Sequence, residues 1–162
     1  MSVRGWIYDQ AILPLTAGWY REVLWRVEPG SHLLDVGIGT GGALAKNADL
    51  VRERDIHITG VDIDEDYVKR CQRLMDKVGL AEHVGVHLRS VTDHHEQGYD
   101  AVYFSASFML MPEPEAVLRH VIDLMNPDGK VFFTQTFQEK RSHRVEGIKA
   151  LLTVVTTVEL GE

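Results

Sequence analysis

The chain has 162 residues, of which 44% are hydrophobic and 25% charged, and this composition predicts one globular domain over residues 1–162. A net charge of −7 gives no general attraction to nucleic acid or to an anionic membrane, so small molecules or proteins are the expected partners. The single cysteine, Cys71, excludes an intramolecular disulfide and a paired-cysteine metal site. Without a signal-peptide pattern or an apolar run of about 18 residues, we expect a cytoplasmic protein with no membrane span and no metal.

The first 30 residues predict a helical cap. Apolar residues recur every three or four positions between residues 8 and 27, and Pro14 should interrupt or start a helix there. The segment is rich in aromatic side chains, which are Trp6, Tyr8, Trp19, Tyr20 and Trp25. We expect them to pack the cap on the domain, and a lid over a ligand is the alternative.

Strands and helices alternate through the middle of the chain. Apolar patterns predict strands over residues 32–36, 56–61, 83–88, 101–104 and 130–137, the last after a turn at 126–129. Helices are expected from Gly41, from residue 65 to Gly79 with Cys71 on the core side, and after Pro112. This order predicts an α/β fold with an open, doubly wound, mostly parallel sheet. Residues 138–162 favour a C-terminal helix, although the β-branched run at 153–158 could pair as a strand.

The rest of the chain is organised around residues 33–42. They predict a buried strand that ends in an acid, then a glycine turn, then a helix start, which is a pattern that holds a cofactor. Gly37, Gly39 and Gly42 satisfy the spacing of dinucleotide-binding folds with Asp62 in reach of a ribose, so an NAD(P)-dependent oxidoreductase is tenable. Asp35, two residues before Gly37, instead favours a cofactor with positive charge.

Four motifs in this order resemble those of the class I S-adenosylmethionine-dependent methyltransferases, a Rossmann-like family, and together they cover residues 31–137. They are Asp35-Val36-Gly37-Ile38-Gly39-Thr40-Gly41, Gly60-Val61-Asp62-Ile63-Asp64, Gly98-Tyr99-Asp100-Ala101-Val102 and Asn126-Pro127-Asp128-Gly129-Lys130. The resemblance implies that Asp35, Gly37, Gly39 and Gly41 hold the methionine part of the cofactor and that Asp62 binds the ribose hydroxyls. It places further cofactor contacts at Ile63, Ser90, Val91, Asp93 and Ser105, with Ser90 at the position where the family commonly has an acid for the adenine.

The implied reaction is methyl transfer to an unidentified acceptor, which is a small molecule, a lipid or a protein. Such a transfer depends on alignment and desolvation and needs no catalytic triad. The general-base candidates are His94, His95 and Tyr8, and we interpret the two histidines as exposed loop residues. We expect the acceptor near residues 105–111, where Ser105, Ser107, Phe108 and Met109 could shape its pocket. Asp35 and Asp62 each have an alternative role as a helix or turn cap.

The family sheet usually finishes with an antiparallel strand pair, and Glu162 comes too soon after residue 137 for both strands. We therefore expect this pair to be lacking, which leaves a sheet edge through which a homodimer could form. A methyltransferase-like protein that binds the cofactor without turnover and acts through partners is an alternative function.

Overall fold

A computed structural model of the chain describes residues 13–137 and 152–158. Its centre is a six-stranded sheet in the order β3-β2-β1-β4-β5-β6. The strands are β1 (His32–Val36), β2 (His57–Asp62), β3 (Val84–Leu88), β4 (Tyr99–Ser105), β5 (Met125–Phe137) and β6 (Leu152–Val158). The first five pair in parallel, and β6 runs antiparallel to β5. The prediction of an open, mostly parallel sheet is confirmed.

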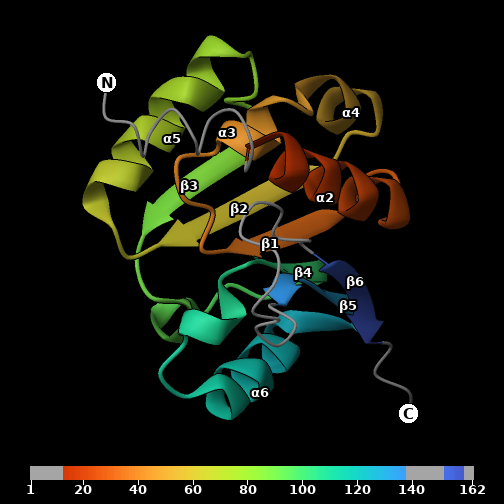
Figure 1. Cartoon of the computed structure of the whole chain (residues 1–162), viewed down its shortest axis with the longest axis vertical. Coiled ribbons are helices and arrows are strands. Elements are labelled where there is room, and N and C mark those ends of the chain that lie inside the picture. The colour runs from red at the N-terminus through yellow and green to blue at the C-terminus, as the bar shows by residue number, and fades with distance from the viewer. Residues whose placement is uncertain (1–12, 138–151, 159–162) are drawn as a thin grey trace, which may run out of the picture.

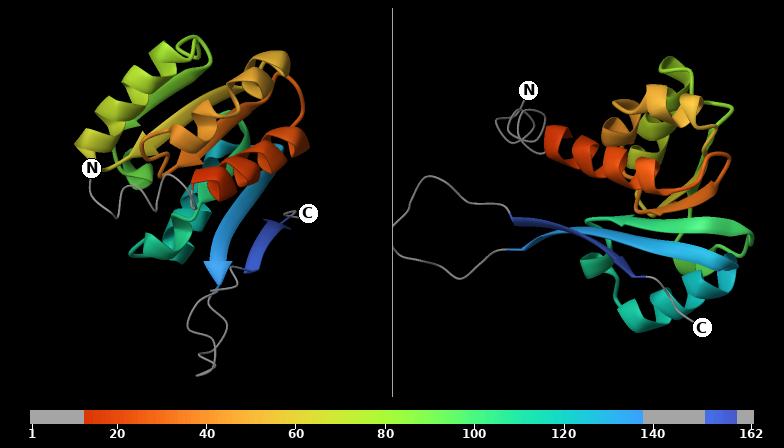
Figure 2. Two further views of the ribbon diagram at one scale, coloured as in Figure 1. Left: turned by 45° about the horizontal axis from the view of Figure 1, so that its top comes forward. Right: turned by 90° about the vertical axis from the view of Figure 1, so that its right-hand side faces the viewer.

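Helices cover the sheet from two sides. On one side lie α2 (Leu13–Arg26), α3 (Gly42–Ala45), α4 (Ala48–Glu53) and α5 (Glu65–Lys77), and on the other lies α6 (Pro114–Leu124), as Figures 1 and 2 show. Two short 3-10 helices, η2 (Val91–Asp93) and η3 (Phe108–Leu110), follow β3 and β4. Each side has its own apolar core, because successive strand residues point to opposite faces. No helix in these described segments is long and apolar enough to cross a membrane.

The helix α5 shows how local sequence sets an element. The Asp64 carboxylate accepts a hydrogen bond of 3.0 Å from the backbone N–H of Tyr67 and so caps the helix start. Val68, Cys71 and Met75 face the core at helical spacing, and Gly79 ends the helix region with a positive φ of 72°. Burial raises the pKa of the Cys71 thiol to about 12, so Cys71 is a core residue, as predicted, and not a nucleophile.

The helix predicted from Gly41 is divided into α3 and α4. Between them the buried side chain of Asn47 donates hydrogen bonds to the carbonyl oxygens of Ala17 (2.9 Å) and Ala43 (3.0 Å). Asn47 therefore connects the segment between α3 and α4 to α2 by hydrogen bonds. Pro14 lies in the first turn of α2, where a proline fits without interrupting the helix.

The turn predicted at residues 126–129 lies within the bounds of β5. Met125 pairs with Tyr99 and Lys130 with Ala101, so residues 126–129 stand opposite the single residue Asp100. The Asn126 side chain donates a hydrogen bond of 2.7 Å to the Asp100 carboxylate and closes this bulge.

The C-terminal helix prediction is wrong for residues 152–158, which form β6. Its β-branched residues pair with the free edge of β5, from Leu152 opposite Phe137 to Val158 opposite Val131. Edge pairing thus outweighs the helical spacing of the apolar residues. The other residues of the predicted helix, 138–151 and 159–162, lie outside the described part of the chain, as do Trp6 and Tyr8.

Candidate functional site

A glycine turn connects β1 to α3 at the carboxyl edge of the sheet. The backbone N–H of Gly37 donates to the carbonyl oxygen of Val61 (2.8 Å), and that of Gly39 donates to the Asp62 carboxylate (2.9 Å). Gly37, Gly39 and Gly41 have φ values of 78°, 62° and 71°, a region that favours glycine. The turn is therefore folded back against the end of β2.

The three glycines meet different surroundings. A Cβ placed on Gly37 would lie 2.7 Å from the Cβ of Ser107, and one on Gly41 would lie 2.5 Å from the Cys71 sulfur. A Cβ on Gly39 would meet no atom within 4 Å. Gly37 and Gly41 thus permit close packing inside the protein, whereas Gly39 borders open space where a ligand can approach the backbone.

Asp62 is held in one orientation at the end of β2. Its Oδ2 accepts the hydrogen bond from Gly39, and its Oδ1 accepts one of 3.0 Å from the backbone N–H of Asp64. Each carboxylate oxygen can accept a further hydrogen bond. The half-buried Asp62 therefore offers two oriented acceptors beside the glycine turn.

Asp35 is completely buried near the end of β1. The Tyr20 hydroxyl of α2 donates a hydrogen bond of 2.7 Å to its Oδ2, while its Oδ1 has no hydrogen-bond partner among the described residues. Burial raises the pKa of the Asp35 carboxyl to about 7, the Tyr20 hydrogen bond opposes this rise, and the Asp62 carboxylate adds to it. A cationic hydrogen-bond donor next to the unpaired Oδ1 would stabilise the ionised form of this buried carboxylate.

On the other side of β1, the segment after β4 rests on the glycine turn. The Ser107 hydroxyl donates a hydrogen bond to the carbonyl oxygen of Val36, and the Phe108 ring packs against Phe104 and Phe133 with centroid distances of 5.1 and 4.9 Å. Ala106 has a φ of 54°, a left-handed conformation that is uncommon for alanine. Ser107 is the residue here whose role sequence reasoning missed, since its contact lies 71 positions away along the chain.

The remaining predicted cofactor residues occupy the same edge with different exposure. Ile63 is 77% exposed after β2, Asp93 is exposed on η2, and Ser105 is half-buried at the end of β4. Ser90 caps η2, with its hydroxyl 2.9 Å from that of Thr92, and Val91 is buried in the core. Ser90 and Val91 therefore have structural roles.

The prediction that His94 and His95 are exposed loop residues is wrong for His94. Its side chain is fully buried, and its Nε2 shares a hydrogen bond of 2.7 Å with the Tyr99 hydroxyl. Burial lowers the pKa of His94, which keeps the ring neutral at pH 7. His95 is exposed, with its ring 5.8 Å from that of His120, and Tyr8 lies outside the described residues.

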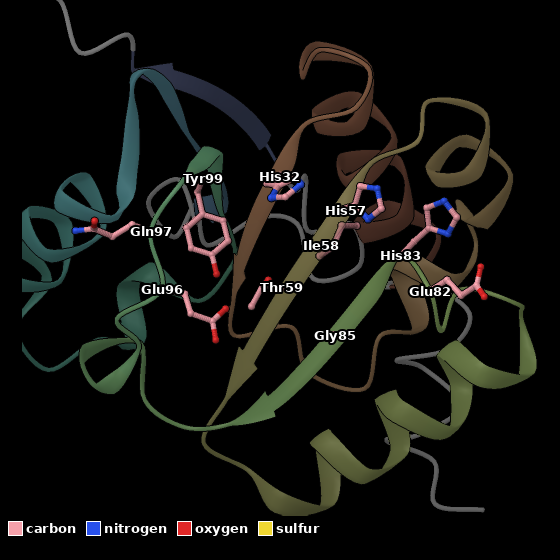
Figure 3. Close-up of a pocket in the computed structure, with 10 residues that line it drawn as sticks. All are labelled: His32, His57, Ile58, Thr59, Glu82, His83, Gly85, Glu96, Gln97 and Tyr99. Carbon is pink, nitrogen blue, oxygen red and sulfur yellow. The ribbon is translucent and has the colours of Figure 1, made fainter.

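A pocket lies at the amino edge of the sheet, the opposite end from the glycine turn. Figure 3 shows His32, His57 and His83 side by side at the starts of three adjacent strands. They are among the residues that line this pocket of about 330 Å³. The Asp55 carboxylate lies 3.5 Å from His57 Nε2 and 3.4 Å from His83 Nε2. Within the described residues, no group of three or more His, Cys, Asp or Glu side chains could hold a metal ion.

The strand order, the glycine turn after β1 and the acid after β2 define a Rossmann-like methyltransferase fold. The family described as "Methyltransferase domain" matches residues 27–153. The chain belongs to this family, the class I S-adenosylmethionine-dependent methyltransferases.

Individual relatives and solved structures agree with this assignment. The chain is similar to the ubiquinone biosynthesis O-methyltransferases of Bordetella bronchiseptica (33% identity over 82% of this chain and 53% of the relative) and Neisseria meningitidis serogroup C (27%, over 70% and 48%). It thus spans about half the length of these curated relatives. An Aquifex aeolicus methyltransferase has a TM-score of 0.66 at 20% identity, covering 77% of this chain and 66% of that one. The [4+2]-cyclase SpnF has a TM-score of 0.67 at 24% identity, covering 82% and 47%. The two solved structures support the fold alone.

Proposed function

We propose that this chain binds S-adenosylmethionine at the glycine turn and transfers its methyl group to an acceptor. The observation that carries the proposal is the pair of acids on either side of the turn. Asp62 presents two oriented carboxylate oxygens next to the open side of Gly39, and Asp35 has a buried oxygen with no partner in the part of the chain that the structure describes. This arrangement suits a ligand with a diol at one end and a cationic group at the other.

The residues present fit this cofactor. Asp62 would accept hydrogen bonds from both ribose hydroxyls, and Asp35 would compensate the cationic amino group, directly or through water. The exposed Ile63 would pack against the adenosine, and Ser90, Val91, Asp93 and Ser105 are further proposed contacts. When bound, the cofactor supplies a methyl group that is activated by a sulfonium charge. The chain would align the cofactor with the acceptor and exclude water from the reacting groups.

We do not assign a general base. His94 is buried and uses its Nε2 toward Tyr99, so its side chain is part of the packing between η2 and β4. The acceptor therefore carries a nucleophile that reacts without a strong base, or loses its proton to water, to the exposed His95 or to a group outside the described residues.

Three further parts of the proposal concern the whole protein. The net charge of −7 supports an acceptor that is not nucleic acid. The composition and the single cysteine support a cytoplasmic location. Within the described residues β6 is an edge strand, and pairing of its outer edge with a second copy would support a homodimer.

Calorimetry followed by a transfer assay tests the proposal. We expect S-adenosylhomocysteine to bind and NADH not to bind, and NADH binding without S-adenosylhomocysteine binding would establish the oxidoreductase alternative. Cofactor labelled on its methyl group is then incubated with cell extract and the protein. Label in an extract component supports methyl transfer. Cofactor binding with no transfer to any component would favour the alternative of a protein that binds the cofactor without turnover and acts through partners.

A further inference from the structure

The pocket at the amino edge of the sheet lies over the side of β2 and β3 that faces away from α5. Ile58 and Val84 pack into the core on the α5 side, so the alternate residues His57, Thr59 and Gly85 point to the other face. There His57 and Thr59 are half-buried and Gly85 is exposed. A parallel sheet usually has apolar residues and a cover on both faces. The polar, partly exposed residues on this face therefore indicate contact with a polar partner.

Two glutamates carry the formal charge of the pocket lining. Its described residues include three histidines, counted as neutral at pH 7, and the carboxylates of Glu82 and Glu96, with no Lys, Arg or Asp. Both glutamates are exposed, and neither forms an ion pair with a residue of the described segments. The lining is therefore acidic and attracts a cation.

Two carboxylates just outside the lining have the same sign. The Asp55 carboxylate lies beside the rings of His57 and His83, at 3.5 and 3.4 Å from their Nε2 atoms. The Asp100 carboxylate accepts a hydrogen bond of 2.8 Å from the backbone N–H of His32. These neighbours add to the acidic character of the pocket.

Two arginines close to the pocket do not reverse this sign. The Arg54 guanidinium is directed toward two backbone carbonyl oxygens at the end of α2, at 2.6 and 3.5 Å. Burial raises the pKa of Tyr99, the hydrogen bond with Thr59 lowers it, the charge of Glu96 raises it and the charge of Arg89 lowers it. Arg89 thus offsets part of the charge at the Glu96 end, and an excess of carboxylates remains.

Glu82 and Glu96 lie at opposite ends of the pocket. Glu82 precedes β3 and Glu96 precedes β4, and β2 and β1 lie between these two strands in the sheet. Figure 3 shows Glu82 beside His83 at one end and Glu96 near Tyr99 at the other. Three strand spacings amount to roughly 14 Å. Since an ammonium group lies about 3 Å from a carboxylate that it binds, two ammonium groups roughly 8 Å apart would reach both glutamates.

The space between the two glutamates suits a narrow aliphatic chain. The rings of His57 and His83 are stacked with their centroids 5.4 Å apart, and they form a flat border along the pocket. Gly85 places no side chain on the floor. The volume of about 330 Å³ is at the lower end of the range of small-molecule sites. Methylene groups could pack along the rings while the charged ends stay at the carboxylates.

We propose that this pocket binds a linear aliphatic diamine, with one ammonium group at Glu82 and the other at Glu96. It is a second small-molecule site, at the opposite edge of the sheet from the glycine turn. The lining shares no residue with that turn, so the inference does not rest on the proposed function.

Calorimetry at pH 8 with 1,8-diaminooctane, 1,4-diaminobutane and octane-1,8-diol tests this inference. At this pH alkyl amines are protonated and imidazole is neutral. We expect 1,8-diaminooctane to bind at least about tenfold more tightly than 1,4-diaminobutane, which has the same charge and is too short to reach both glutamates. The diol matches the longer diamine in length without its charge, and we expect it to bind more weakly than either diamine.

The single variants Glu82→Gln and Glu96→Gln should each reduce the preference for the longer diamine to less than about threefold, because one end is then no longer held by a charge. Both side chains are exposed, so these variants should fold. Glu113→Gln is the matched control, because Glu113 is an exposed glutamate before α6 that does not line this pocket. It should keep the full preference.

Equal affinity for the two diamines, diol binding as tight as that of 1,8-diaminooctane, or a preference that survives in both Glu82→Gln and Glu96→Gln would overturn the inference. Absence of binding by either diamine would overturn it as well. The proposed function is tested separately by S-adenosylhomocysteine binding, which none of these outcomes affects.

Discussion

The Tyr20 hydroxyl donates a 2.7 Å hydrogen bond to the Asp35 carboxylate, and both side chains are buried. This bond connects α2 to the strand end that precedes the glycine turn. It also makes α2 part of the environment that sets the charge of Asp35. The helix α2 therefore affects the proposed cofactor site through a polar contact as well as through packing.

Replacing Tyr20 with Phe should destabilise the protein more at pH 8 than at pH 5. At pH 8 the bond has an ionised acceptor, and its loss should lower the free energy of unfolding by about 1.5–3 kcal/mol. At pH 5 the carboxyl is protonated and the loss should be about 1 kcal/mol. Urea unfolding at both pH values measures this. Tyr103→Phe is the control, because the Tyr103 hydroxyl shares a neutral buried bond of 2.8 Å with Thr134. The loss of unfolding free energy in Tyr103→Phe should not depend on pH. If the loss in Tyr20→Phe is equally independent of pH, Asp35 does not ionise between pH 5 and pH 8.

The raised pKa of Asp35 should make the free protein less stable as pH rises. The folded-state pKa is about 7 and the ordinary value is 3.8, so between these values the folded protein holds a proton that the unfolded chain has lost. The stability from this group is therefore complete below about pH 4 and is lost as pH rises through about 7.

The Asp35→Asn variant isolates this effect, because it cannot ionise and is otherwise similar in shape. Relative to the original protein, its free energy of unfolding should increase between pH 4 and pH 8 by a difference on the order of 3 kcal/mol. Urea unfolding of both proteins across this range measures the difference. A constant difference would show that Asp35 has an ordinary pKa.

Asp62→Ala should weaken binding of S-adenosylhomocysteine by about 1.5–3 kcal/mol, since it removes charge-assisted hydrogen bonds. Calorimetry measures the dissociation constant, and circular dichroism checks that the variant is folded. Asp62 also holds the backbone of Gly39 and Asp64, so Asp62→Asn serves as the comparison, because its amide oxygen can keep one of these bonds. If a folded Asp62→Ala protein binds S-adenosylhomocysteine with unchanged affinity, Asp62 does not bind the ribose.

Substitutions of Gly37 and Gly39 should affect protein stability and cofactor binding to different extents. Gly37→Ala should cost about 2–4 kcal/mol of unfolding free energy, because its Cβ would overlap Ser107 and its φ is positive. Gly39→Ala should cost only about 1 kcal/mol of unfolding free energy, since its Cβ enters open space. Relative to this stability loss, its loss of S-adenosylhomocysteine affinity should be larger than that of Gly37→Ala. Thermal unfolding and calorimetry on both variants provide the comparison. Equal stability losses would show that Ser107 does not limit space at Gly37.

Much of the fold could be predicted because its signals are local. Apolar runs, turn residues and helix caps identified the parallel strands and α5, and the spacing from Gly37 to Asp62 placed both at one sheet edge. The C-terminal strand was harder, because residues 152–158 carry both a helical spacing and a strand composition. Pairing with the edge of β5 decided between them, and a single segment contains no information on that partner.

The details of the site depend on contacts between distant residues. Tyr20 and Asp35 are 15 positions apart, and Ser107 contacts Val36 across 71 positions, with no periodicity that relates either pair. His94 lies in a polar loop, and its burial follows from the position of Tyr99 at the start of β4. Sequence patterns indicated which residues surround the turn, whereas burial and charge state required the folded structure.

The row formed by His32, His57 and His83 gives the molecule a built-in spectroscopic probe. The rings sit on or next to the first residues of three parallel strands, with neighbouring centroids 5.4 Å apart, and at the opposite edge from the glycine turn. Their imidazole proton resonances should report whether β1, β2 and β3 keep their register in each variant, with little direct perturbation by a ligand at the turn. Damage to the sheet could then be distinguished from damage to the site in a single titration.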